Sequence, residues 1–142
     1  MSRHSVIAAA LIAIAVIAVG CTVNVSPGTP ATVLVSATGR SIPAGQQVLA
    51  FLITPLAGKG VTISVQASTD AADPEFEVIR GEVSVEERDD VTLGDVIETA
   101  NDESPGQEIG RFTPEFAQPY TIFVMDDNNI PGATFSVTVT QR

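Results

Sequence analysis

The sequence VTISVQAS, residues 61–68, alternates apolar and polar side chains without a break. Because successive side chains of a β-strand point to opposite faces, this period of two predicts a half-buried strand. The residues just before it, Gly58-Lys59-Gly60, are typical of a tight turn. The same alternation returns at Thr134–Thr140, where three apolar residues alternate with four hydroxyl residues. Strands are therefore expected to dominate the chain.

Further short runs, bounded by Gly, Pro, Asn or Asp, extend this interpretation. Residues 47–54 and 119–125 are apolar at nearly every position, which predicts strands covered on both faces. After Asp73-Pro74 the alternation predicts inward side chains at Phe76 and Val78, continuing at Val83 and Val85. Residues 91–97 are expected to form another strand, with a short helix as the alternative. The remaining strands are expected at residues 32–37 and around Ile109 and Phe112.

Seven to nine short strands with turns at regular spacing predict an all-β fold. We expect one antiparallel, jelly-roll-like β-sandwich over residues 32–142, with a core formed by its two inner faces. No amphipathic pattern longer than two helical turns and no internal repeat occurs. One domain is expected, because about 120 residues suffice for a single hydrophobic core.

The first twenty residues follow the pattern of a secretory signal. Arg3 and His4 precede fourteen residues, 6–19, without a charged or polar side chain. As a helix this stretch spans about 21 Å, which is short of the ~30 Å hydrocarbon layer of a bilayer. A cleaved signal peptide over residues 1–20 is therefore expected, and the protein is expected to be exported.

Cys21 is the only cysteine of the chain and directly follows this segment. Ala18-Val19-Gly20-Cys21 resembles the lipobox of bacterial lipoproteins, although that family prefers Leu where Ala18 stands. The resemblance implies that the sulfur of Cys21 carries a diacylglycerol and that the chain is cut before Cys21. The alternative is a plain secreted protein with a free thiol. Residues 22–31, TVNVSPGTPA, are expected to form a flexible tether that reaches at most ~33–36 Å.

The charge is strongly negative and unevenly distributed. The formal net charge is −10, and fourteen of the seventeen acidic residues lie between Asp70 and Glu108. This composition argues against nucleic acid as a partner, and against electrostatic attraction to anionic lipid, because both need basic patches. An acidic face of this kind attracts cations or a basic partner, and the alternative is a solvated surface that keeps the protein soluble.

The order of these elements resembles the bacterial pre-peptidase C-terminal domain, a small β-sandwich found on exported proteins. The matching stretches are PAGQQVLAF (43–51), GVTISV (60–65), DPEFEV (73–78), GDVIETANDE (94–103), PYTIFV (119–124) and residues 132–139. The chain departs from the family in its extra acidic sequence, residues 81–93, and in having no peptidase domain beside the module. The resemblance implies a sandwich that aids export or holds a polymeric substrate.

Catalysis is not expected. His4 is the only histidine and leaves with the signal peptide, which removes histidine-dependent nucleophilic catalysis and a zinc site built from His and Cys. Carboxylate pairs could serve a glycosidase, but the chain has no Trp and a single Tyr to stack against sugars.

No organic cofactor is expected either, and calcium is the alternative that the oxygen-rich loops leave open. Calcium prefers six to eight oxygen ligands, which Asp and Asn side chains supply. The candidate ligands are Asp102, Glu103, Asp126, Asp127 and Asn128. The alternative is that these residues only form turns through hydrogen bonds to their own backbone.

Two functions fit these observations. The first is a membrane-anchored, outward-facing lipoprotein of the bacterial envelope that binds a protein or polysaccharide partner without catalysis. The second is a structural or accessory envelope lipoprotein without a discrete ligand site. Calcium bound by the oxygen-rich loops would stabilise such a protein. Converging polar groups in a pocket would favour the first function, and a solid core with convex loops the second.

Overall fold

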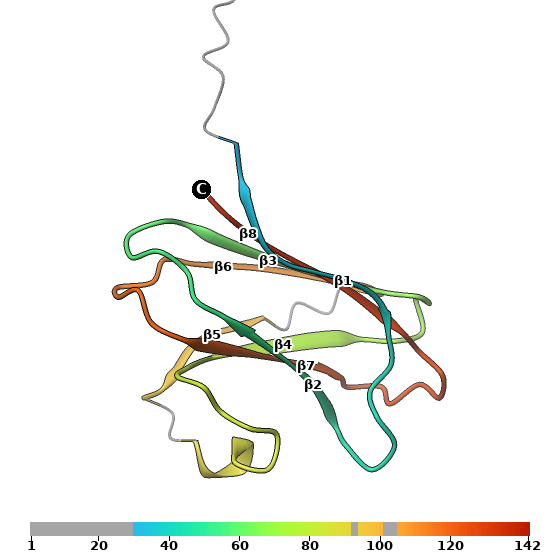
Figure 1. The fold of residues 1–142 in the computed structure, drawn as a ribbon. Coiled ribbons are helices and arrows are strands. Elements are labelled where there is room, and N and C mark those ends of the chain that lie inside the picture. Colours follow the sequence, from blue (N-terminus) through green and yellow to red (C-terminus); the bar gives the residue numbers. More distant parts are fainter. Residues whose placement is uncertain (1–29, 92–93, 101–104) are drawn as a thin grey trace, which may run out of the picture.

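The computed structural model describes residues 30–91, 94–100 and 105–142. The chain forms two four-stranded antiparallel sheets packed face to face, which confirms the all-β sandwich (Figure 1). The elements are β1 (Thr32–Arg40), β2 (Val48–Ile53), β3 (Val61–Ala67), β4 (Pro74–Arg80), a 3-10 helix η1 (Arg88–Asp90), β5 (Val96–Ala100), β6 (Gln107–Phe112), β7 (Tyr120–Asp126) and β8 (Phe135–Gln141).

The strand order is that of a jelly roll. Sheet A has the order β1-β8-β3-β6 and sheet B the order β2-β7-β4-β5. First and last strands therefore pair with each other, as do β2 with β7, β3 with β6 and β4 with β5. This is one long antiparallel ribbon rolled into two layers, which confirms the jelly-roll-like sandwich.

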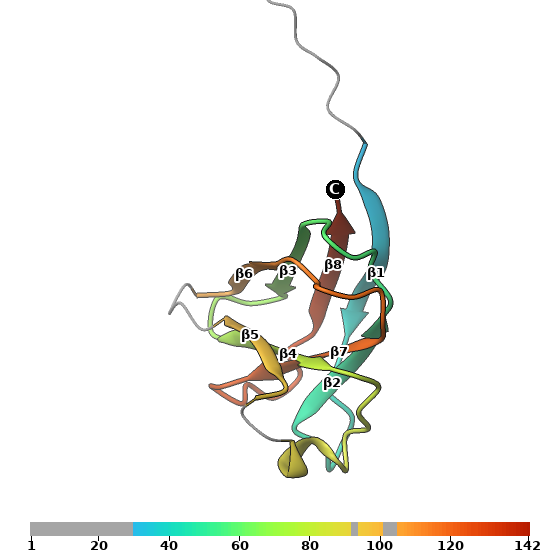
Figure 2. The ribbon, with the colours of Figure 1, turned by 90° about the vertical axis from the view of Figure 1, so that its left-hand side faces the viewer.

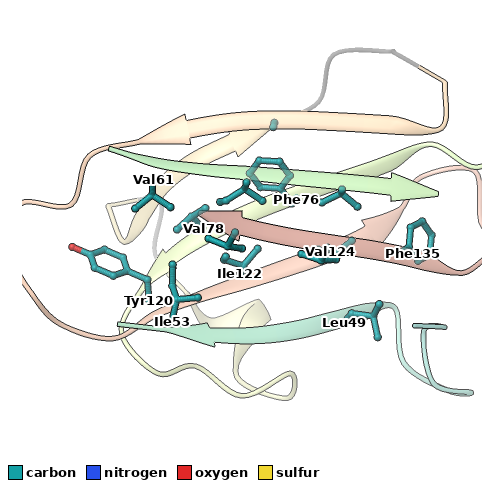
Figure 3. Packing of buried hydrophobic residues seen from close by; sticks show 14 of the residues in the cluster. Leu49, Ile53, Val61, Phe76, Val78, Tyr120, Ile122, Val124 and Phe135 are labelled. Carbon is teal, nitrogen blue, oxygen red and sulfur yellow. The ribbon is translucent and has the colours of Figure 1, made fainter. Parts of the chain in front are cut away.

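Apolar side chains from both sheets fill the space between the layers (Figure 3). The alternation predicted for residues 61–68 and 134–140 is confirmed, with Ile63, Val65, Val137 and Val139 fully buried. Gly110 of β6 leaves room for the Phe76 ring, since a Cβ atom at Gly110 would lie 2.6 Å from Phe76 Cζ. The core is therefore closely packed at this point.

Four local expectations are corrected. Val83 and Val85 are not in a strand, because β4 ends at Arg80 and Gly81 takes a positive φ of 100°. Of the strand expected at residues 91–97, Val96 and Ile97 belong to β5 and Val91 to no strand, while residues 92–93 lie outside the described residues. β2 is covered on both faces only at its start, and β1 runs on to Arg40. The strand expected around Ile109 and Phe112 is confirmed as β6, in which the side chains of Glu108 and Phe112 are buried and Ile109 is 47% exposed.

The strand register defines two ends of the sandwich. At the terminal end, Thr32 of β1 pairs with Gln141 near the C-terminus, and the loops 54–60 and 113–119 lie beside them. The far end carries the loops 41–47, 68–73 and 127–134. Figure 2 shows the start of β1 and the C-terminus together on the side of sheet A, and η1 below sheet B. Within the described residues no helix is long and apolar enough to span a membrane.

Candidate functional site

The predicted calcium ligands at the end of β7 form a turn at the far end. Asp126 is 6% exposed. Its Oδ1 accepts hydrogen bonds from the backbone N–H groups of Asp73 (3.0 Å) and Asn128 (3.2 Å), and its Oδ2 accepts one from Ile130 (2.8 Å). Asn128 is exposed and donates from Nδ2 to the carbonyl oxygen of Ala71 at 3.1 Å. The Asp126 carboxylate thus ties two loops together through charge-assisted hydrogen bonds.

The other candidate residues are only partly brought together. Asp127 is exposed beside Asp126. Asp102, Glu103 and the predicted lipid-attachment residue Cys21 lie outside the described residues. Among residues 30–91, 94–100 and 105–142, no three His, Cys, Asp or Glu side chains are grouped so as to hold a metal ion. Calcium binding therefore stays a prediction.

The far end is nevertheless a region of negative potential. Burial of the Glu75 carboxyl raises its pKa, and the neighbouring carboxylates of Asp127, Asp73, Glu108 and Glu77 raise it further. Like charges disfavour the ionised form of a carboxyl group. The fold has thus gathered acids from β4, β6 and the loop after β7.

The extra acidic segment, residues 81–91, folds back over the outer face of sheet B. It covers a second, smaller apolar cluster whose buried members are Val48, Ile79 and Phe123. Val83 and Val85, which were expected in a strand, are among the residues packed against this cluster. We call residues 81–91 the cover segment.

Arg88 holds the cover segment against sheet B. Its Nη2 lies 3.0 Å from Glu77 Oε2 and 3.5 Å from Met125 Sδ, and its guanidinium lies 6.0 Å from the centre of the Phe123 ring. Arg88 and Glu77 are 22% and 28% exposed, so solvent screens their pair only in part. The segment therefore has a defined position on the sheet.

A local turn orders the cover segment further. The backbone N–H of Ser84 donates to Glu87 Oε2 at 3.0 Å, and the Glu87 N–H donates to the Ser84 carbonyl oxygen at 3.2 Å. The hydrogen bonds from the Ser84 backbone and side chain lower the pKa of Glu87. The ordered cover segment carries five exposed acidic residues over the outer face of sheet B. They are Glu82, Glu86, Glu87, Asp89 and Asp90.

The outer face of sheet A has the opposite character. Its four strands contain one acidic residue, Glu108, which is buried at 2% exposure. The outward positions of β3, β6 and β8 carry Ser, Thr and Gln together with Ile109 and Arg111. Charge in this domain is thus segregated between a face without exposed carboxylates and an acidic face.

An open hollow of about 520 Å³ lies on the outer side of sheet A at the terminal end. Arg111 and Arg142 line it together with Thr62, Thr113 and Thr140. Within the described part of the chain, neither guanidinium forms an ion pair or a side-chain hydrogen bond. Two guanidinium groups beside hydroxyl groups suit a phosphate or carboxylate.

The arginine pair was not predicted from the sequence. Arg111 and Arg142 are 31 positions apart in the chain, and only the pairing of β3 with both β6 and β8 brings their strands together. The one signal in the sequence for this arrangement was the alternation of apolar and polar residues along the strands. This alternation places Thr62, Arg111 and Thr140 on outward positions.

Two comparisons with known proteins identified no relative of this chain. No family model matches the chain, and a search of curated proteins finds no significant match. The resemblance to the pre-peptidase C-terminal domain and the lipoprotein assignment therefore remain predictions from the sequence.

Proposed function

We propose that this protein is an exported, lipid-anchored module of the bacterial envelope that acts by non-covalent binding rather than by catalysis. The anchor is Cys21, and the working surface is the acidic face formed by the cover segment. The segregation of charge between the two faces is the observation that carries this proposal.

The position of the acidic face supports a binding role. The cover segment, which carries the five exposed carboxylates, packs on the outer face of sheet B, whereas β1, which follows the proposed anchor and tether, belongs to sheet A (Figures 1 and 2). The apolar cluster and Arg88 order them, which lowers the entropy lost on binding. A partner with a basic surface, either a protein or a cationic polymer, fits this face.

The hollows of the surface support binding over catalysis. The open hollow lined by Arg111 and Arg142 holds no nucleophile paired with a base among its described lining residues. The second function predicted from the sequence, an accessory lipoprotein without a ligand site, is favoured by the packed core between the sheets.

Two experiments test the proposal. Cells grown with an alkyne-modified fatty acid should label the wild-type protein, whereas Cys21→Ser should remove the label. Equal labelling of both proteins would contradict the anchor. For the acidic face, the combined substitutions Glu86→Gln, Glu87→Gln, Asp89→Asn and Asp90→Asn should abolish salt-sensitive crosslinking to partners in the envelope. Glu115→Gln, at the terminal end, is the control, and unchanged crosslinking in the fourfold variant would contradict the binding face.

A further inference from the structure

We propose that the terminal end of the domain docks on the anionic lipid surface to which the chain is tethered, with the outer edge of sheet A facing the headgroups. This inference rests on the lipid anchor of the proposed function and adds an orientation to it. The docking surface consists of Val33, Leu56, Lys59, Arg111, Phe116 and Arg142.

Strand pairing places these residues together at one end. Val33 of β1 pairs with Thr140 of β8, and the backbone N–H of Arg142 donates to the Gly60 carbonyl oxygen at 3.0 Å. Gly58 N–H donates to the Pro114 carbonyl oxygen at 2.8 Å, which joins the loops that carry Leu56 and Phe116.

The side chain of Gln141 fixes the Leu56 loop. Its Oε1 accepts from the Leu56 N–H at 3.0 Å, and its Nε2 donates to the Leu56 carbonyl oxygen at 2.9 Å. Gln141 is buried, so the loop is held by a partner that water does not displace readily. Leu56 is thereby held in an exposed position.

Three of the large exposed apolar side chains lie at the terminal end. Phe116 is 59% exposed, Leu56 63% and Val33 58%. The other two large exposed apolar side chains, Leu52 and Ile109, lie on strands, and none of the five lies in the described far-end loops. Apolar side chains beside basic ones are the composition of surfaces that enter the headgroup region of a bilayer.

The local charge complements anionic lipid although the chain as a whole is acidic. Lys59, Arg111 and Arg142 provide three cations, and Glu115 is the one carboxylate of the loops 54–60 and 113–119. The connection after β4 also starts at this end, since the Gly81 N–H donates to the Pro119 carbonyl oxygen at 2.9 Å, and it places Glu82 on the side of sheet B. The cover segment packs on the outer face of sheet B, so the sandwich separates it from the outer face of sheet A, and salt screens its exposed carboxylates. The Arg111 and Arg142 guanidinium groups, free of protein partners in the described structure, can each donate to a lipid phosphate.

The tether between Cys21 and β1 limits how far the terminal end can move from the lipid surface. Residues 22–31 span at most ~33–36 Å, so an anchor at Cys21 keeps the terminal end close to the lipid surface. Tethering raises the effective concentration of the surface, and a weak docking contact is then occupied most of the time. Each of the three basic residues strengthens such a contact with an anionic bilayer.

The test uses the full-length, acylated protein in vesicles of phosphatidylcholine with or without phosphatidylglycerol. The chain contains no Trp, so Phe116→Trp provides a single fluorescent reporter. Brominated lipids should quench this indole in phosphatidylglycerol vesicles but not in pure phosphatidylcholine, and 0.5 M salt should reverse the quenching. Glu86→Trp, on the cover segment, is the matched reporter that should stay unquenched in both.

Substitution of the arginines identifies the contact. In the Phe116→Trp protein, Arg111→Gln with Arg142→Gln should lower the docking constant about thirtyfold and remove the quenching, whereas Arg40→Gln at the far end should leave the quenching unchanged. Equal quenching of the two reporters, or quenching independent of the arginines, would overturn the proposal. Burial of the Phe116→Trp indole that depends on protein concentration would also overturn it, by showing a second copy as the occupant.

The same vesicles separate failure of the docking from failure of the anchor. Loss of protein from floated vesicles would contradict the anchor, and with it the proposed function on which the docking rests. Floated protein whose Phe116→Trp indole stays unquenched would contradict the docking alone.

Discussion

Asp126 is the residue on which the far end of the sandwich depends most. Its two carboxylate oxygens accept three backbone hydrogen bonds from residues on both sides of the loop pair. A buried N–H that loses its acceptor costs about 1–3 kcal/mol. The carboxylate therefore stabilises the ends of β4 and β7 together.

Asp126→Ala should lower the free energy of unfolding by about 3 kcal/mol, since three backbone donors lose their acceptor together. Denaturant unfolding followed by circular dichroism measures this change. The exposed neighbour Asp127→Ala should change stability by less than about 0.5 kcal/mol. Equal effects of the two substitutions would show that the hydrogen bonds of Asp126 contribute little.

Glu75→Gln should raise the melting temperature slightly at pH 7. The pKa of Glu75 is raised by burial and by its acidic neighbours, so its ionised form destabilises the fold. The native state binds the proton more tightly than the unfolded state, so this destabilisation disappears as the pH falls through the raised pKa toward the ordinary value near 4.5. Calorimetry at pH 7 and pH 4 compares both proteins, with Glu115→Gln as the control. A lower melting temperature for Glu75→Gln at pH 7 would contradict this explanation.

Gly110→Ala should destabilise the protein by about 1–3 kcal/mol, because the new methyl group would lie 2.6 Å from Phe76 Cζ in a closely packed core. Gly60→Ala is the matched control, since no atom lies within 4 Å of its added Cβ and its φ is not positive. Chemical denaturation of both variants gives the comparison. A neutral effect at Gly110 would mean that the Phe76 ring can move.

At the scale of elements, the strands with a clean period of two could be predicted, and the segments stabilised by distant partners could not. β3 and β8 follow their alternation because one face meets the core and the other meets solvent. In β6 the side chain of Ile109 faces solvent and that of Glu108 faces the core. The pairing with β3, rather than local hydrophobicity, therefore decided the register of this strand.

The structure of the cover segment also depends on distant residues and could not be predicted from its own sequence. Val83 and Val85 have the spacing of a strand, but Gly81 turns the chain and the apolar cluster on sheet B offers the valines a place to pack. The prediction therefore found apolar residues that are partly buried but assigned them the wrong structure. The charge of the segment was visible in the sequence, and its position over sheet B was not.

Arg88→Ala should loosen the cover segment without unfolding the sandwich. The substitution removes the ion pair with Glu77 and the contact with Phe123, together worth about 1–1.5 kcal/mol for a half-buried site. Hydrogen exchange of amides in residues 81–91 should then accelerate about tenfold, whereas exchange in β3 should stay unchanged. Arg80→Ala, at an exposed position, is the control. Uniform acceleration over the whole domain would indicate global destabilisation instead.

For the whole molecule, the distribution of charge matters more than its sum. The net charge of −10 argued against any electrostatic attraction to anionic lipid. The fold places the acidic cover segment over the outer face of sheet B and three cations at the terminal end, so one molecule presents surfaces of different charge. Composition alone cannot predict this segregation, because it depends on which strands pair.

The central claim is that Cys21 anchors this jelly roll to a membrane, and the intact mass of the protein extracted from membranes tests it most directly. We predict a chain that begins at Cys21, lacks residues 1–20 and carries the added mass of a diacylglycerol, with or without a further acyl chain. A chain that keeps residues 1–20, or one that begins elsewhere with an unmodified thiol or no cysteine, would contradict it.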